Sequence, residues 1–105
     1  MDAIPCIILS TASAENAEVI ARTLVTERLA ACVNMTQVRS VYRWKGEFCD
    51  DHEILLVIKT LESEKGNVMA RIRSLHSYEL PEMLVLPVAG GYAPYLEWLA
   101  GETRL

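Results

Sequence analysis

The order of apolar segments along this 105-residue chain predicts an α+β domain of the ferredoxin-like type, a β-α-β-β-α-β sandwich with a short C-terminal helix. Two kinds of pattern support this fold class. Four short runs are rich in apolar and β-branched residues, as strands are, and two longer segments repeat their apolar residues every three or four positions, as helices do. No linker, repeat or low-complexity tract interrupts the chain, so we expect a single domain over residues 1–105.

The first strand and helix are predicted between residues 4 and 31. Ile4–Leu9 is apolar at consecutive positions, which is typical of a strand buried on both faces. Ser13 can cap the following helix, because its hydroxyl can accept a hydrogen bond from the first turn. One face of this helix is apolar for nearly four turns. The residues of that face are Ala17, Ile20, Ala21, Leu24 and Ala31.

The second and third strands are predicted at Cys32–Trp44 and His52–Thr60, with Lys45-Gly46-Glu47 marking a turn or bulge. At about 3.3 Å per residue, a continuous 32–44 strand would measure roughly 40 Å, so it should overhang a domain with a radius of gyration of roughly 13 Å. We expect this overhang and its aromatic residues to clasp a neighbouring subunit. The alternative is a bent hairpin that packs on its own chain.

The second half of the chain repeats the pattern. A helix is predicted at Glu62–Leu75, then a loop over residues 76–82, a strand at Met83–Val88 and a short helix at Tyr92–Ala100. Two helices can cover only one face of the sheet, yet the strands are apolar at consecutive positions. We therefore expect a homo-oligomer that covers the second face.

Three aromatic residues of the terminal helix, Tyr92, Tyr95 and Trp98, are spaced three apart. This spacing places them on one helix face, and we predict that they lie in the core or at an interface.

The composition narrows the class of protein. Ten Lys and Arg residues against fourteen Asp and Glu give a formal charge of −4 and an isoelectric point near 5.1, which disfavours nucleic-acid binding. No membrane-spanning run or secretory signal is recognisable, so we expect no membrane contact and a cytoplasmic protein. Cys6, Cys32 and Cys49 are an odd number at wide spacing, which predicts reduced thiols rather than disulfides or a zinc knuckle.

The loop before the fourth strand carries a candidate metal site. His76, Glu79 and Glu82 lie around a sharp turn before Pro81, and loops at strand ends often aim polar groups at ligands. Imidazole and carboxylate groups bind divalent metals, and water or another subunit would complete the ligand set. The alternative is a loop histidine that is hydrogen-bonded to the backbone.

A second group of metal-binding residue types lies in Cys49-Asp50-Asp51-His52-Glu53. In an extended strand, positions 49, 51 and 53 face one way and positions 50 and 52 the other, so the thiol and the imidazole would converge only at a bulge. We therefore predict a solvated hairpin tip here.

Catalysis is not predicted. No nucleophile signature accompanies the cysteines or histidines, and the loop Ser10-Thr11-Ala12-Ser13 lacks the glycines of a phosphate-binding turn. A hydrolase of acyl or phosphoryl substrates would rest on fold analogy alone. Lys59, at the end of the third strand, could pair with a carboxylate or meet an anionic ligand.

Five separated motifs span nearly the whole chain: Leu29-Ala30-Ala31-Cys32-Val33-Asn34, Tyr42-x-Trp44-x-Gly46, Ile58-Lys59-Thr60, Tyr78-x-x-Pro81-Glu82, and Leu86-Pro87-Val88 with Tyr95-Leu96-x-Trp98. In order and spacing they resemble the CutA divalent-cation tolerance family. The resemblance implies a ferredoxin-like subunit in a tight homotrimer, similar in architecture to the PII signalling proteins, with clefts between subunits. It also implies an association with copper and other divalent cations, and no established reaction.

The resemblance further implies copper ligands at a Cys that ends the first strand and at a His-His pair before the Tyr78 loop. Ser10 and Leu75 stand at two of these positions, and only His76 is retained.

We therefore expect a homotrimeric divalent-cation (copper) tolerance protein that binds metal weakly through His76, with Glu79 or Glu82 assisting. It would serve signalling or act as a scaffold, without an organic cofactor. The alternative is a PII-like sensor or adaptor whose intersubunit cleft holds a small anionic ligand or a partner protein. The residues expected at that cleft are Tyr42, Trp44, Lys59 and Tyr78.

Overall fold

The computed structural model describes residues 3–103. Its elements are β1 (Pro5–Ala12), α1 (Ala14–Thr26), β2 (Cys32–Trp44), β3 (Glu47–Leu61), the 3₁₀ turn η1 (Glu62–Glu64), α2 (Lys65–Leu75), β4 (Leu84–Pro87) and α3 (Ala93–Glu102). The strands form one antiparallel sheet in the order β2-β3-β1-β4, which places β1 and β3 at its centre. The predicted ferredoxin-like fold with a C-terminal helix is confirmed.

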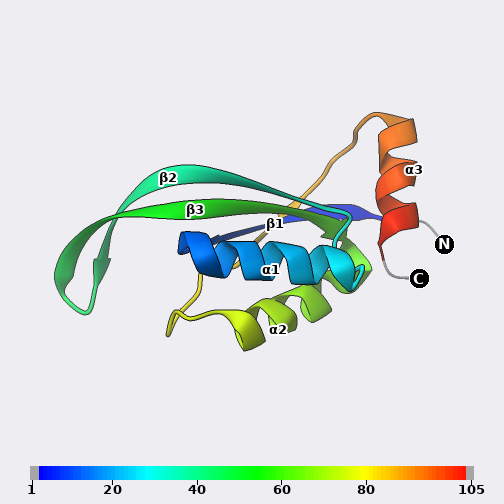
Figure 1. Ribbon diagram of the computed structural model, residues 1–105. Coiled ribbons are helices and arrows are strands. Elements are labelled where there is room, and N and C mark those ends of the chain that lie inside the picture. The colour runs from blue at the N-terminus through cyan, green and yellow to red at the C-terminus, as the bar shows by residue number, and fades with distance from the viewer. Residues whose placement is uncertain (1–2, 104–105) are drawn as a thin grey trace.

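The core lies between the sheet and the two longer helices. α1 and α2 run along one face of the sheet, and α3 stands at the end opposite the tip of the β2–β3 hairpin (Figure 1). Burial alternates along the central strands, so Cys6 and Ile8 of β1 and Leu56 and Ile58 of β3 are fully buried under the helices. Apolar helix residues complete this core: Ala17, Ile20, Ala21, Leu24, Val68 and Ile72.

α1 begins as predicted but ends earlier than its apolar pattern indicated. The Ser13 side chain accepts a hydrogen bond from an amide in the first turn, which confirms the cap. At the other end, Arg28 adopts a left-handed φ of 60°, and the amides of the next two residues donate back to the Leu24 carbonyl at 2.9 and 3.2 Å. This reversal places Ala31 outside the helix, so its assignment to the helix face was wrong.

The β2–β3 hairpin is continuous and overhangs the sheet, as predicted. Lys45 and Gly46, with φ of 51° and 82°, form a two-residue turn between the paired residues Trp44 and Glu47. The pairing then runs without a bulge to the far end of β2. β1 pairs with β3 only from Ile54 onward, so residues 47–53 and their partners in β2 extend beyond the sheet. The molecule measures 47 × 25 × 20 Å as a result (Figure 1).

Two strands are longer than the apolar runs that predicted them. β1 continues to Ala12 rather than Leu9, and β3 begins at Glu47 rather than His52. In both cases the additional residues are paired with a neighbouring strand, which satisfies their backbone groups whatever the polarity of their side chains.

The second face of the sheet is only partly covered within one chain. Burial on both faces was predicted for the central strands, but Ile7, Leu9, Leu55 and Val57 remain partly exposed while alternate residues are fully buried. The helices of one chain therefore bury only one face, and burial of the second face was predicted from association with another copy. Cover by another copy of the chain stays a prediction.

Tyr95 and Trp98 of α3, and Tyr92 directly before it, are not core residues. Tyr92, Tyr95 and Trp98 are 76%, 39% and 45% exposed, which excludes a position in the core of the single chain. Their position at an interface between subunits stays a prediction. None of the helices within residues 3–103 combines the length and the apolar character that crossing a bilayer requires.

A buried hydrogen bond attaches the α1–β2 connection to the sheet. The Thr60 hydroxyl donates to the Leu29 carbonyl at 2.6 Å, and the Ala31 amide donates to the Lys59 carbonyl at 3.0 Å. We expect Thr60→Val, which keeps the shape but leaves the Leu29 carbonyl without this donor, to lower the free energy of unfolding by about 1–3 kcal/mol in urea denaturation. Thr26→Val, at the exposed last residue of α1, is the control and should change it by less than about 0.5 kcal/mol. Equal effects of the two substitutions would contradict this assignment.

Candidate functional site

A groove of about 830 Å³ lies where the β2–β3 overhang leaves the end of β1. Its walls come from three parts of the chain: the end of β1, the overhanging strands and the loop between α2 and β4. The acidic residues that line it are Asp51, Glu53, Glu79 and Glu82, and the aromatic residues are Tyr42, Trp44 and Tyr78. The groove thus collects most of the site residues that the sequence predicted.

The alternation of β3 turns two carboxylates away from the helices. Because Leu56 and Ile58 are buried under α1 and α2, the odd-numbered residues Asp51 and Glu53 lie on the opposite face. The last residue of β1, Ala12, pairs with Ile54, so β1 does not extend alongside these two carboxylates. They are therefore accessible to the α2–β4 loop.

Two tyrosines donate hydrogen bonds to these carboxylates. The Tyr42 hydroxyl donates to Asp51 Oδ2 at 2.5 Å, and the Tyr78 hydroxyl donates to Glu53 Oε1 at 2.9 Å. The hydrogen bond to Asp51 raises the pKa of Tyr42, and burial, followed by the bond to Glu53, raises the pKa of Tyr78 to about 12. Both phenols are therefore protonated at neutral pH and hold the carboxylates in place.

His76 holds the loop against the end of β1. The backbone amide of Tyr78 donates to His76 Nδ1 at 3.1 Å, so in the neutral ring Nε2 carries the proton and donates to the Thr11 carbonyl at 2.7 Å. The ring also lies 4.6 Å from the Tyr78 ring, centroid to centroid. This is the alternative role considered for a loop histidine. A metal ion on either ring nitrogen would have to replace one of these backbone contacts.

Asn16 anchors the other side of the loop to α1. Its side-chain amide donates to the Leu75 carbonyl at 3.1 Å, and its carbonyl oxygen accepts from the Ser77 amide at 3.0 Å. Asn16 was not predicted from the sequence, because its partners lie about 60 positions further along the chain.

The two predicted glutamates of the loop also have partners. Glu79 forms an ion pair with Lys45 at 3.1 Å, and Glu82 accepts a long hydrogen bond of 3.4 Å from the Thr11 hydroxyl. Within residues 3–103, no three His, Cys, Asp or Glu side chains converge closely enough to hold a metal ion. One chain alone therefore does not assemble His76, Glu79 and Glu82 into a metal centre.

Lys59 lies apart from the other residues predicted for the cleft. Tyr42 pairs with Cys49 of β3, and Lys59 lies ten positions further along that strand, roughly 33 Å away at the rise of an extended strand. Its ammonium group instead lies 5.8 Å from the centre of the Tyr95 ring of α3. Within one chain, the groove combines Tyr42, Trp44 and Tyr78 without Lys59.

The charge of the groove is negative. Four carboxylates line it, and among the described residues no Lys or Arg does, although Lys45 reaches Glu79 at its edge. A concave surface lined by one sign of charge concentrates ions of the opposite sign. The groove is therefore suited to a cation rather than to a small anion.

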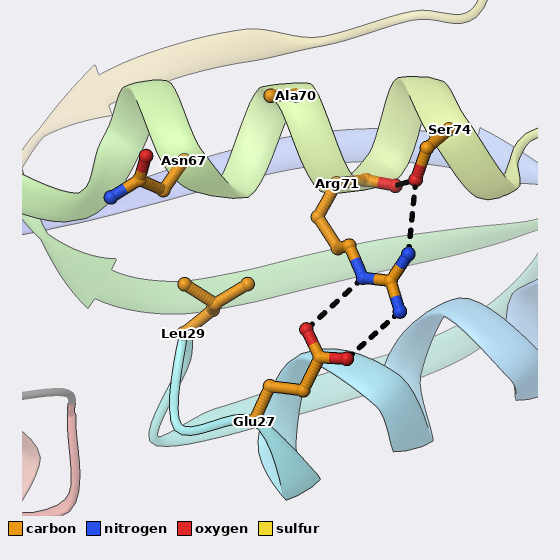
Figure 2. Close-up of a pocket in the computed structure, with 6 residues that line it drawn as sticks. All are labelled: Glu27, Leu29, Asn67, Ala70, Arg71 and Ser74. Carbon is orange, nitrogen blue, oxygen red and sulfur yellow. Dashed lines mark hydrogen bonds and ion pairs between the residues drawn. The ribbon is translucent and has the colours of Figure 1, made fainter.

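A smaller pocket of about 330 Å³ lies between α2 and the connection that follows α1 (Figure 2). Arg71 fills one side of it with a two-point ion pair to Glu27, at 3.0 Å from Nε and 2.8 Å from the terminal nitrogen. The guanidinium group also donates to the Ser74 hydroxyl at 3.2 Å. These contacts give the guanidinium group of Arg71 hydrogen-bond partners within the protein and connect α2 to the end of α1. We therefore assign the pocket a structural role.

We expect Tyr78 to make the free energy of unfolding decrease as the pH becomes alkaline. Its pKa rises to about 12 on folding, whereas an unfolded tyrosine titrates near about 10. The stability it contributes is therefore complete below pH 10 and is lost as the pH rises toward 12, because the unfolded chain gives up the proton first. In urea denaturation at several pH values, the stability of Tyr78→Phe should fall less steeply over this range than that of the wild type. Tyr92→Phe, at a 76% exposed site, is the control and should follow the wild type.

Comparison with known proteins identifies the family. A family model described as the CutA1 divalent ion tolerance protein matches residues 6–102. The divalent-cation tolerance protein CutA of Thermus thermophilus is 43% identical over 98 residues, which cover 92% of this chain and 95% of that protein. The human protein CutA is 46% identical over 89 residues, and these cover 84% of this chain but only 50% of the human protein.

Solved structures agree with the sequence comparison. The structure of Cut A1 from Thermus thermophilus has a TM-score of 0.91 and covers 96% of this chain and 100% of its own. The PII-like protein CutA of Nostoc sp. PCC 7120, in its apo form, is 40% identical with a TM-score of 0.91, covering 95% of this chain and 98% of its own. Sequence similarity and fold thus both extend along nearly the whole chain, and the protein belongs to the CutA1 divalent ion tolerance family.

Proposed function

We propose that the protein is a homotrimeric divalent-cation tolerance protein whose acidic groove binds divalent cations weakly and which acts in signalling or as a scaffold rather than in catalysis. The observation that supports this proposal is the lining of the groove: four carboxylates and, among the described residues, no Lys or Arg. We propose the cytoplasm as its compartment.

The donor atoms of the groove favour hard cations. Its four carboxylates supply oxygen, which suits Mg²⁺ and Mn²⁺, whereas copper(II) prefers nitrogen, for which His52 is the one imidazole on the described lining. The imidazole predicted for copper is His76, whose ring nitrogens contact the Thr11 carbonyl and the Tyr78 amide. We assign Glu82 and Glu79 as ligands of a cation that keeps part of its water shell, and His76 as the residue that positions their loop.

The apolar second face of the sheet supports the trimer. Ile7, Leu9, Leu55 and Val57 are partly exposed there, and large side chains around them are exposed. Leu84 and Leu86 of β4, which pair with Leu9 and Ile7, and Tyr95 and Trp98 of α3 are among these exposed side chains. A monomer rarely leaves so many large apolar groups in water, and association of identical subunits would bury them.

The alternative of a small anionic ligand has less support. An anion in the groove of one chain would face Asp51, Glu53, Glu79 and Glu82. Lys59 could offset this charge only if a neighbouring subunit brought it to the groove. The cation is therefore the ligand that the single chain favours.

Calorimetric titration of reduced, tag-free protein with Mn²⁺ and, separately, with copper(II) at neutral pH tests the proposal. We expect weak saturable binding of Mn²⁺ to a trimer, with the oligomeric state measured by light scattering on the same sample. Glu82→Gln should weaken Mn²⁺ binding by about threefold or more, since it removes one charged ligand.

Glu97→Gln on α3 makes the same change of charge away from the groove and should leave the affinity unchanged. His76→Ala distinguishes the two metals. Loss of copper binding with Mn²⁺ binding retained would show that copper uses the imidazole. Absence of saturable binding by either ion would contradict the proposed function.

A further inference from the structure

The groove has a second chemical feature that binding of a metal ion does not require. Its walls carry the rings of Tyr42, Trp44 and Tyr78 in addition to its carboxylates. Aromatic faces attract organic ammonium groups through the negative potential of the ring, and carboxylates add charge and hydrogen bonding. A volume of about 830 Å³ is in the range of small-molecule pockets.

The protein itself places an ammonium group at the edge of this groove. Lys45 Nζ lies 3.1 Å from Glu79 Oε1 and 5.6 Å from the centre of the Trp44 ring, and both partners line the groove. Lys45 belongs to the two-residue turn of the hairpin and directly follows Trp44 in the chain. The contacts of Lys45 thus define a position that accepts an alkylammonium ion between a ring and a carboxylate.

A second position for positive charge lies further along the same groove. Asp51 and Glu53 are two residues apart on one face of β3, and each accepts a hydrogen bond from a tyrosine. Each carboxylate has further lone pairs that can accept hydrogen bonds from a ligand ammonium.

We propose that the groove binds a small aliphatic diamine. One ammonium group replaces that of Lys45 between Trp44 and Glu79, and the other lies toward Asp51 and Glu53. Lys45 then acts as a tethered competitor that lowers the affinity of the site. This proposal shares the groove and its charge with the proposed function but depends on the aromatic walls, which binding of Mn²⁺ does not require.

Calorimetric titration of the protein with 1,4-diaminobutane at neutral pH and low salt tests the proposal. We expect weak saturable binding to the wild type. The neutral 1,4-butanediol and the anionic succinate, which have similar chain lengths, should not bind. Equal binding of the diol, or no saturation with the diamine in either the wild type or Lys45→Met, would overturn the proposal.

Two variants examine the ammonium position. Lys45→Met should tighten diamine binding by about threefold or more, because it removes the tethered competitor. Lys65→Met is the matched control, since Lys65 also pairs with a glutamate, Glu62, but outside the groove, and it should leave the affinity unchanged. Unchanged affinity in Lys45→Met would overturn the competitor role.

Trp44→Leu separates the diamine from the metal ion. It should weaken diamine binding by about threefold or more and leave Mn²⁺ affinity within about twofold, because only the organic cation uses the ring. Equal weakening of both ligands would overturn the aromatic contribution. Thermal melting of each variant confirms that it is folded. Binding of Mn²⁺ without binding of the diamine would overturn this inference and leave the proposed function in place. Binding of the diamine without binding of Mn²⁺ would overturn the proposed function and leave this inference in place.

Discussion

The continuous, bulge-free register of the β2–β3 hairpin is the constraint on which the rest of the site depends. Pairing from Cys32 with Lys59 to Trp44 with Glu47 keeps every odd-numbered residue of β3 on one face. A shift of one residue would turn Asp51 and Glu53 toward the helix-covered face and bring Leu56 and Ile58 out of the core. The same buried contacts that stabilise the fold therefore determine which carboxylates reach the groove. The tight turn at Lys45 and Gly46 fixes this register, and the Lys45 ammonium group lies over the adjacent Trp44 ring.

The loop between α2 and β4 completes the groove because it is attached at two points. His76 connects it to the end of β1, and Asn16 connects it to the first turn of α1. These contacts hold Tyr78 where its hydroxyl meets Glu53. A histidine in an acidic loop suggests a metal ligand from its residue type alone. The structure shows it bound to two backbone groups, so its position explains the geometry of the loop better than it explains direct coordination.

The fold was largely predictable because its determinants are local: apolar runs, helical periodicity, the Ser13 cap and the Gly46 turn. The element bounds that were predicted wrongly also have physical causes. Arg28 ended α1 in a left-handed conformation that is uncommon for a residue other than Gly, and the pairing of polar residues lengthened β1 and β3 beyond their apolar runs. For the site, alternation correctly placed Asp51 and Glu53 on one face. Their pairing with Tyr42 and Tyr78 depends on tertiary contacts, up to 25 positions apart for Tyr78 and Glu53, that no local pattern encodes.

We propose that the groove between the β2–β3 overhang and the α2–β4 loop is the cation-binding site of this CutA1 family member. Anomalous diffraction from crystals grown with Mn²⁺ tests it most directly, because the signal locates the ion without reference to any assumed ligand. We predict an anomalous peak in the groove beside Glu82 and Glu79, in every subunit of a trimer. A peak bound to His76 in place of its backbone contacts, or Mn²⁺ only at sites outside the groove, would contradict the account.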